Sequence, residues 1–451
     1  MKWSVRRAVW LRCVCCFALT GAVAFADVNL SGGSAKATVD TAAVQARAGH
    51  ANTEESEKVD RENTVADTDV AQPEVSAKAA VLVDVNSGRV LYEKNADEQL
   101  PIASITKIMT AIVAIEHGNL DDIVTVSPRA TRKEGSSVYL KKGERISLRH
   151  LLYGLMLRSG NDTAVAIAEF IGKSEEGFVT LMNEKAEYLG MTHSHFANPH
   201  GLDAAGHYSS ARDMATLTRY ALANEEFQKI VATHAIQVPD PGEKWNRKWY
   251  NKNKMLSLFP GADGVKTGYT SKARRTLVAS ATQSGQQLVT VTLNAPDDWR
   301  DSSEMLAYGF RQYPLRAVVK RGEVVHMVPQ ADKGEPTVNI VAAQDFQYPL
   351  TETERTAVAQ QVHVDERLVA KVSAGAHVGT LSLSLHGKVI GSVPLTVQSN
   401  GQRTSQGNSQ GKSRGGRQEN SDANGTRRAG EEQSFFVRWL SLISPVWGGR
   451  N

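Results

Sequence analysis

Cysteine is scarce in this chain of 451 residues, which contains three, at positions 13, 15 and 16. All three lie in residues 1–26, which have a basic start, an apolar middle and a small-residue ending at Ala24, Phe25 and Ala26. This pattern is typical of a secretory signal peptide that is cleaved after Ala26. The mature chain would then contain no cysteine, which excludes a disulfide framework and restricts any nucleophile to an oxygen or an amine. A retained membrane anchor is the alternative interpretation.

Aromatic residues and sustained hydrophobic periodicity are missing from residues 27–75, which are rich in Ala, Thr, Asp, Glu and Ser. Such a segment buries too little apolar surface to fold, so we expect a disordered spacer. Residues 399–433 are rich in Gly, Ser, Asn and Gln with scattered Arg and Lys, which predicts a flexible basic linker. The net charge of +4 is small, and a nucleic-acid partner is not expected.

The C-terminal residues 434–451 contain an apolar run that is too short to span a bilayer, which needs about 20 residues. On a helix its large apolar side chains fall on one arc: Phe435, Phe436, Trp439, Leu440, Leu442 and Ile443. We expect an amphipathic helix that anchors an exported, extracytoplasmic protein peripherally to the outer face of the cytoplasmic membrane. The alternative is a helix that docks on its own protein.

Residues 76–315 combine strand and helix patterns. Two apolar runs around residues 86–88 predict a β-hairpin. A run with helical spacing then ends at Gly118, and Ser147 and Asp162 are candidate N-caps of two further helices. Strand patterns return from "GADGVKTGYT" onward, before a closing helix. Strands at both ends with helices between them indicate one α+β domain.

Residues 316–398 follow a strand pattern. Leu381, Leu383 and Leu385 alternate with small polar residues before a turn near Gly387. Strict alternation is the mark of half-buried strands, so we expect a small, separate all-β domain.

The stretch "PIASITKIMTAI" places Ser104 and Lys107 three positions apart at the mouth of an apolar run. On a helix that begins near Ser104 the two side chains share one face. A buried lysine is costly unless it is neutral or has a function. Desolvated by apolar neighbours, Lys107 would lose its proton near neutral pH and act as base toward Ser104, whose backbone N–H is free to bind an oxyanion. For an isolated S-x-x-K match, a helix cap with a snorkelling lysine remains the simpler interpretation.

Two further motifs follow in order. Ser159, Gly160 and Asn161 form an S-x-N triplet on a short loop between two apolar helices. The residues "KTG" at 266–268 occur at the start of a predicted strand, where glycine lets a substrate backbone approach closely and pair in β fashion. S-x-x-K, S-x-N and K-T-G in this order are the motif set of penicillin-binding proteins and class A β-lactamases.

The three motifs, together with "LKKGERISLRHLLYGLMLRSGNDTAVAIAE" and "LGMTHSHFANPHGLDAAGHYSSARDMA", resemble the serine-type D-Ala-D-Ala carboxypeptidases, the low-molecular-mass penicillin-binding proteins of peptidase family S11. The resemblance covers most of residues 78–315. It implies the penicillin-binding protein/β-lactamase-like transpeptidase fold, an antiparallel sheet flanked by helices with a helical insert, followed by the small C-terminal β domain. It also implies that the enzyme removes the terminal D-Ala of peptidoglycan stem pentapeptides through an acyl-serine, that β-lactams inhibit it covalently, and that it needs no cofactor or metal.

The resemblance also implies roles for individual residues. The catalytic group would be the nucleophile Ser104, its base Lys107, and the second-motif residues Ser159 and Asn161. The substrate-binding group would be Lys266, Thr267, Gly268, Tyr269 and Arg300. In this assignment the N–H groups of Ser104 and Tyr269 form the oxyanion hole. Lys266 and Arg300 would hold the substrate's terminal carboxylate, a role for which cations are suited.

Rival functions make different demands on the sequence. A class A β-lactamase needs a glutamate that activates the deacylating water, and no E-x-x-L-N-like segment follows the S-x-N loop. A D,D-endopeptidase on the same fold is not separable by sequence. A metal hydrolase would draw on the histidines at 193, 195, 200 and 207, but no H-E-x-x-H accompanies them. A catalytically silent wall-binding protein would leave the motifs unexplained; Trp245, Trp249 and Tyr250 would suit glycan contact, or simply a half-buried hairpin.

Overall fold

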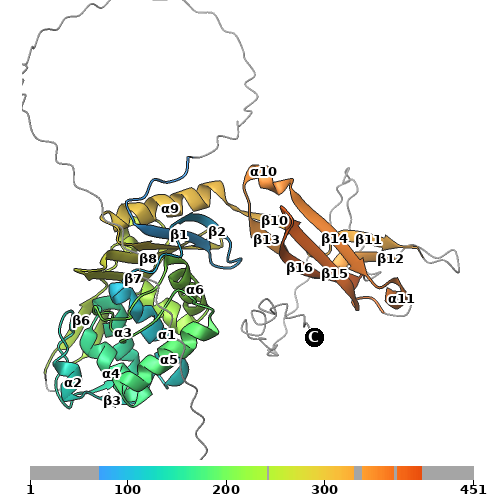
Figure 1. Cartoon of the computed structure of the whole chain (residues 1–451). Coiled ribbons are helices and arrows are strands. Elements are labelled where there is room, and N and C mark those ends of the chain that lie inside the picture. The colour runs from blue at the N-terminus through green and yellow to red at the C-terminus, as the bar shows by residue number, and fades with distance from the viewer. Residues whose placement is uncertain (1–70, 241–242, 330–337, 370–372, 399–451) are drawn as a thin grey trace, which may run out of the picture. The chain divides into compact units, whose positions relative to one another are not determined.

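The computed structural model describes residues 71–240, 243–329, 338–369 and 373–398 (Figure 1). The expected signal peptide, basic linker and amphipathic helix, and nearly all of the expected spacer, lie outside the described residues. Within the described ranges, no helix combines the length and the apolar character that crossing a membrane requires.

A five-stranded antiparallel sheet of order β2-β1-β9-β8-β7 forms the centre of the first domain. Its strands are β1 (Ala79–Asp84), β2 (Val90–Lys94), β7 (Ala262–Thr270), β8 (Arg274–Gln283) and β9 (Gln286–Leu293). The pairing of β1 with β9, with Ala79 opposite Leu293, joins the two ends of the domain into one sheet. The hairpin predicted around residues 86–88 is confirmed by the pairing of β1 with β2, and the predicted combination of sheet and helices is present.

Helices cover both faces of this sheet (Figure 1). The central strand β8 shows why, because Val278 packs into the core shared with α1 (Lys107–His117), whereas Leu277 packs into the core shared with α9 (Asp298–Gln312). Six successive residues of β8, from Thr276 to Ala281, are buried, and Leu277, Val278 and Ala279 follow one another without polar alternation. The sheet therefore separates α1 from α9.

The larger helical layer contains two predicted helices that meet at the S-x-N loop. Ser147 caps α3 (Leu148–Arg158) by accepting a hydrogen bond from the N–H of His150, as predicted. The prediction that Asp162 caps the next helix is wrong, because α4 (Asn161–Gly172) begins one residue earlier, after Gly160. The carboxylate of Asp162 instead accepts N–H groups from the separate segment 138–140.

The first domain contains further elements besides these. They are η1 (Ala103–Thr106), β3 (Ile123–Thr125), α2 (Pro128–Thr131), β4 (Arg145–Ser147), α5 (Glu175–Tyr188), α6 (Ala211–Leu222), α7 (Glu225–Ala232), β5 (Ala235–Pro239), β6 (Asn246–Tyr250) and α8 (Met255–Leu258). The hairpin of β5 and β6 is half-buried as expected, with Trp249 inside and Trp245 exposed.

The C-terminal domain is built mainly from antiparallel strands, as the alternation of leucines predicted. A five-stranded sheet of order β11-β12-β16-β15-β14 buries Leu381 and Leu383 in its own core. Its elements are β10 (Leu315–Val319), β11 (Val324–Val328), β12 (Val338–Ala342), β13 (Phe346–Pro349), α10 (Glu352–Arg355), β14 (Val358–Val364), α11 (Glu366–Val369), β15 (His377–Leu385) and β16 (Lys388–Val397).

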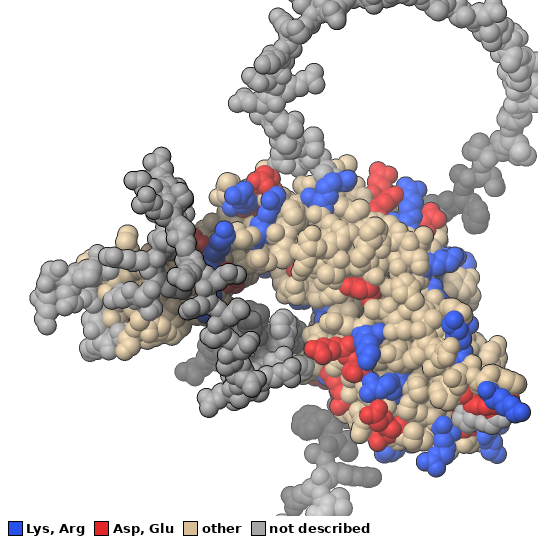
Figure 2. All heavy atoms as spheres, turned by 180° about the vertical axis from the view of Figure 1, so that it is seen from behind, with Lys and Arg blue, Asp and Glu red and all other residues tan. Residues whose placement is uncertain are grey.

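Charged side chains of both signs are interspersed on the face that Figure 2 shows, mostly around its margin, with a broad uncharged area between them. The small positive surplus of the chain is therefore not gathered into a patch of one sign on this face.

Candidate active site

The predicted nucleophile and base lie on one continuous turn. The 3₁₀ turn η1 carries Ser104 and leads directly into α1, whose first residue is Lys107. The Oγ of Ser104 and the Nζ of Lys107 are 3.0 Å apart. Ser104 is partly exposed, whereas Lys107 has no exposed surface. A substrate can therefore reach the hydroxyl but not the amine behind it.

The environment of Lys107 matches a neutral amine. Its Nζ donates to Oδ1 of Asn161 at 2.7 Å and to the backbone carbonyl of His200 at 2.5 Å. Burial, and then the charge of Lys266, hold the pKa of Lys107 well below its usual value. An uncharged amine has two N–H groups and one lone pair, so once the two acceptors are satisfied the lone pair is left for the hydroxyl of Ser104.

The S-x-N triplet sits where α3 ends and α4 begins. Ser159 is buried and adopts a left-handed conformation with φ of 63°, a position that helix ends usually give to glycine. Asn161 follows, and its Nδ2 donates to the carbonyl of Glu134 at 2.7 Å. Because that bond fixes the amide, its Oδ1 is held toward Lys107. The strained corner thus orients one of the two acceptors of the base.

The K-T-G residues lie within β7 rather than at its start. Lys266 is 2% exposed, and its Nζ donates to the carbonyl of Thr267 at 2.8 Å. Burial, and then the charge of Lys252, lower the pKa of Lys266 to about 7. A Cβ added to Gly268 would lie 3.0 Å from the backbone nitrogen of Ser104, so the backbones of β7 and η1 touch there. The next residue, Tyr269, is exposed.

Sequence reasoning missed a loop that supports the nucleophile turn, which is η1 with Ser104. The segment 198–207 provides the His200 carbonyl, and a Cβ on Gly201 would overlap the carbonyl oxygen of Ala103. The N–H of Ala197 donates to Nδ1 of His207, so Nε2–H is left to donate to the hydroxyl of Thr106, which in turn donates to the carbonyl of Ala103. This chain fixes the residue before Ser104. The histidine-rich sequence was the available signal.

The two histidines of this loop, His200 and His207, are neutral, and both ring nitrogens of each make a hydrogen bond. His200 accepts the N–H of Leu202 at Nδ1 and donates Nε2–H to Glu175, 3.1 Å away. Burial lowers the pKa of His200 and of His207 to about 4. The hydrogen bond from His200 lowers the pKa of Glu175 to about 2. No group of three or more His, Cys, Asp or Glu arranged to hold a metal ion occurs among the described residues.

Among the contacts of the described residues, none joins Arg300 to the other predicted site residues. It lies in α9, which packs on the face of the sheet opposite to α1, and its Nε pairs with Glu304 at 2.7 Å. The cation that does act on the site is Lys252, an exposed residue after β6 whose charge lowers the pKa of both Lys107 and Lys266. It belongs to no motif, so the sequence offered no signal for it.

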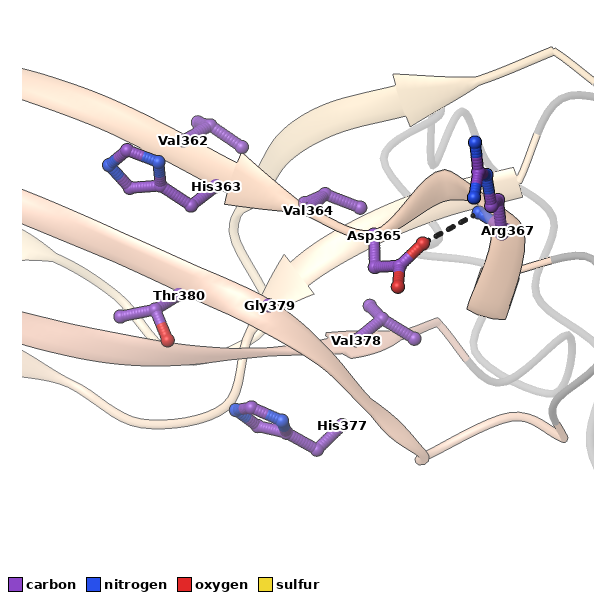
Figure 3. Close-up of a pocket in the computed structure, with 9 residues that line it drawn as sticks. All are labelled: Val362, His363, Val364, Asp365, Arg367, His377, Val378, Gly379 and Thr380. Atoms are coloured by element: carbon purple, nitrogen blue, oxygen red, sulfur yellow. Dashed lines mark hydrogen bonds between the residues drawn. The ribbon is translucent and has the colours of Figure 1, made fainter.

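A separate open hollow of about 880 Å³ occurs in the C-terminal domain, along β14 and β15 (Figure 3). Five of its lining side chains are polar or charged: His363, Asp365, Arg367, His377 and Thr380. The side chains of His363 and His377 are well separated in this view, and Asp365 accepts the N–H of Arg367. His363 lies opposite Thr380 in the pairing of β14 with β15, and no hydrogen bond joins these two side chains among the described residues.

Comparison with known proteins agrees with this geometry. Residues 66–297 match the family model described as D-alanyl-D-alanine carboxypeptidase. The chain belongs to this family. Residues 313–403 match the model of the C-terminal domain of penicillin-binding protein 5. Membership establishes a serine peptidase, and it confirms the fold class that the motifs predicted.

The matches to individual relatives cover most of the length of each relative. The chain is 34% identical over 332 residues to the D-alanyl-D-alanine carboxypeptidase DacF of Bacillus subtilis, covering 71% of this chain and 85% of that one. It is 36% identical over 358 residues to DacC of Escherichia coli K12, covering 74% and 86%. Among solved structures, penicillin-binding protein 5 from Haemophilus influenzae is similar, with a TM-score of 0.59, 29% identity, and coverage of 73% and 98%.

Proposed function

We propose that this carboxypeptidase removes the terminal D-Ala from peptidoglycan stem pentapeptides through an acyl-enzyme on Ser104, and that penicillins acylate the same residue. The observation that carries the proposal is the buried, low-pKa amine of Lys107, which has two acceptors for its N–H groups and faces the Ser104 hydroxyl.

The chemistry proceeds in two halves. Ser104 Oγ attacks the carbonyl carbon of the penultimate D-Ala while Lys107 takes the hydroxyl proton. The backbone N–H groups of Ser104 and Tyr269 are proposed to bind the oxyanion, since β7 touches η1 at this point. The peptide bond breaks, the leaving D-Ala amine takes a proton, and the acyl-serine remains. Water then attacks the ester, which frees the shortened peptide and restores the hydroxyl.

Recognition of the substrate's free carboxylate follows from the charges around the site. Lys266 is buried without a carboxylate partner in the described structure, and Lys252 is close enough to lower its pKa. An anion that binds near two neighbouring positive charges stabilises the charged form of both. We therefore assign the substrate carboxylate to Lys266 and Lys252, and leave Arg300 to its pair with Glu304.

The decisive test is mass spectrometry of a pentapeptide muropeptide after incubation with the enzyme. Loss of one alanine is expected, and Ser104→Ala should produce none. An unchanged peptide would contradict the proposal. Nitrocefin provides the second measurement, because sustained turnover would indicate a β-lactamase, whereas one slow burst is expected of a carboxypeptidase. Cleavage of a cross-linked muropeptide would show endopeptidase activity.

The place of action is proposed from the sequence. The signal-like residues 1–26 support export, and the amphipathic pattern of residues 434–451 supports peripheral attachment to the outer face of the cytoplasmic membrane. Deletion of residues 434–451 should release penicillin-binding activity into the soluble fraction. Continued retention in the membrane fraction would contradict this attachment.

A further inference from the structure

Tyr139 occupies a position that the proposed reaction leaves unexplained. It is 85% exposed, more than any other large hydrophobic residue of the described structure. Its backbone is left-handed, with φ of 61°. A left-handed conformation costs free energy for a residue with a bulky side chain, and the exposed ring makes up for none of it by burial. Strain and exposure together suggest that the ring serves a binding function.

The segment around Tyr139 is held rigidly. The N–H groups of its neighbours Val138 and Leu140 both donate to the carboxylate of Asp162, at distances of 3.1 to 3.2 Å. The hydroxyl of Ser137 donates to the same carboxylate and accepts the N–H of Tyr139 at 2.8 Å. Val138 and Leu140 are buried on either side. The exposed ring is therefore presented by a fixed backbone rather than by a loose loop.

The same segment is tied to the catalytic residues. Asp162 follows Asn161 in α4, and Asn161 donates its backbone N–H to the carbonyl of Ser136 at 2.7 Å. Tyr139 is three residues beyond Ser136, which places its backbone roughly 10 Å or less from that of Ser136. In a pentapeptide substrate four residues separate the scissile bond from the sugar, a span of about 13 Å when extended. The ring is therefore within reach of the sugar of a bound stem peptide.

We propose that Tyr139 is a binding site for the sugar ring that carries the stem peptide, and this inference rests on the proposed function. An isolated aromatic face without surrounding walls suits the flat apolar face of a pyranose, with the phenol hydroxyl at the wet edge. A peptide side chain would need a pocket, whereas a sugar needs one plane. Substrate already attached to glycan would then bind more tightly than free peptide.

The test compares kcat/KM for a disaccharide-pentapeptide and for the same pentapeptide without sugar. Enzyme concentration is set by titration with labelled penicillin, so that unfolded protein does not count. The wild type should favour the sugar-bearing substrate about five- to tenfold, mainly through KM, which is the range of one aromatic contact. Tyr139→Ala should bring the ratio close to one, and Tyr139→Phe should keep it. Tyr188→Ala, which removes an exposed tyrosine at the end of α5, should also keep it.

Each outcome decides between explanations. A wild type without preference, or a Tyr139→Ala enzyme that loses equally on both substrates, would overturn the sugar site and indicate a peptide or structural contact. Failure of the wild type on both substrates would instead overturn the proposed function. Tyr139→Gly separates strain from binding, because it should lose the preference while its melting temperature is unchanged or higher.

Discussion

Replacing Gly268 by alanine should slow the acylation of Ser104 by about two orders of magnitude, because it pushes β7 away from the nucleophile turn. The added Cβ would overlap Oγ1 of Thr276 and lie 3.0 Å from the backbone nitrogen of Ser104. Ordinary contacts of this kind begin at 3.4 Å, so the hydroxyl of Thr276, which donates to the carbonyl of Ile102 just before Ser104, must move by about 1 Å. A misplacement of that size at a reacting group costs about 100-fold in rate.

A second substitution tests where this strain acts. Thr276→Ala removes the atom in the closest contact, and leaves the weaker one with Ser104. The double variant Gly268→Ala/Thr276→Ala should therefore recover part of the lost rate, whereas Thr276→Ala alone should lose little beyond one hydrogen bond to the carbonyl of Ile102.

The assay is the second-order rate of labelling by fluorescent penicillin, with thermal unfolding measured in parallel. Gly285→Ala serves as a control, since it strains a turn with φ of 80° but meets no atom within 4 Å. It should lower stability by about 1 kcal/mol and leave acylation intact. If Gly268→Ala acylated at the wild-type rate, the contact between β7 and the Ser104 turn would not determine the reactive geometry.

Three further predictions concern Ser104, Lys252 and His207. Ser104→Ala should abolish covalent labelling by penicillin on a denaturing gel, and a labelled variant would require another nucleophile. Lys252→Gln should raise the pKa of Lys107 by removing a like charge, so the acid limb of the acylation rate moves to higher pH; Lys254→Gln, an exposed neighbour, should leave the profile in place. His207 has a folded pKa of about 4, below its usual 6.5, so the unfolded state binds the proton first. Stability should therefore fall as pH drops from about 6.5 to about 4, by about 3 kcal/mol from this group. Urea unfolding of His207→Gln, which cannot titrate, should show a weaker pH dependence; an unchanged one would show that His207 is not buried neutral.

Local rules account for the successful predictions. Ser104 and Lys107 share a face because helical geometry brings positions three apart together, and Ser147 caps α3 because its hydroxyl reaches an N–H three residues on. Asp162 shows where such rules fail. Its position in the first turn of α4 suits a cap, but the N–H groups of the segment 138–140 compete for the same carboxylate. A local sequence pattern does not show that N–H groups from a distant segment bind the same carboxylate.

The sequence by itself determined the candidate reactive groups: a serine, a lysine among apolar neighbours, and two polar motifs in fixed order. The tertiary structure decided what surrounds them. Lys107 meets an amide 54 positions away and a carbonyl 93 positions away, and these two acceptors, with burial, define the direction of its lone pair. The charge of Lys252 shows the same dependence, because this residue follows the hairpin of β5 and β6 and lowers the pKa of Lys266 from a separate part of the chain. Electrostatic and steric contacts depend on distance in space, and only the fold sets that distance.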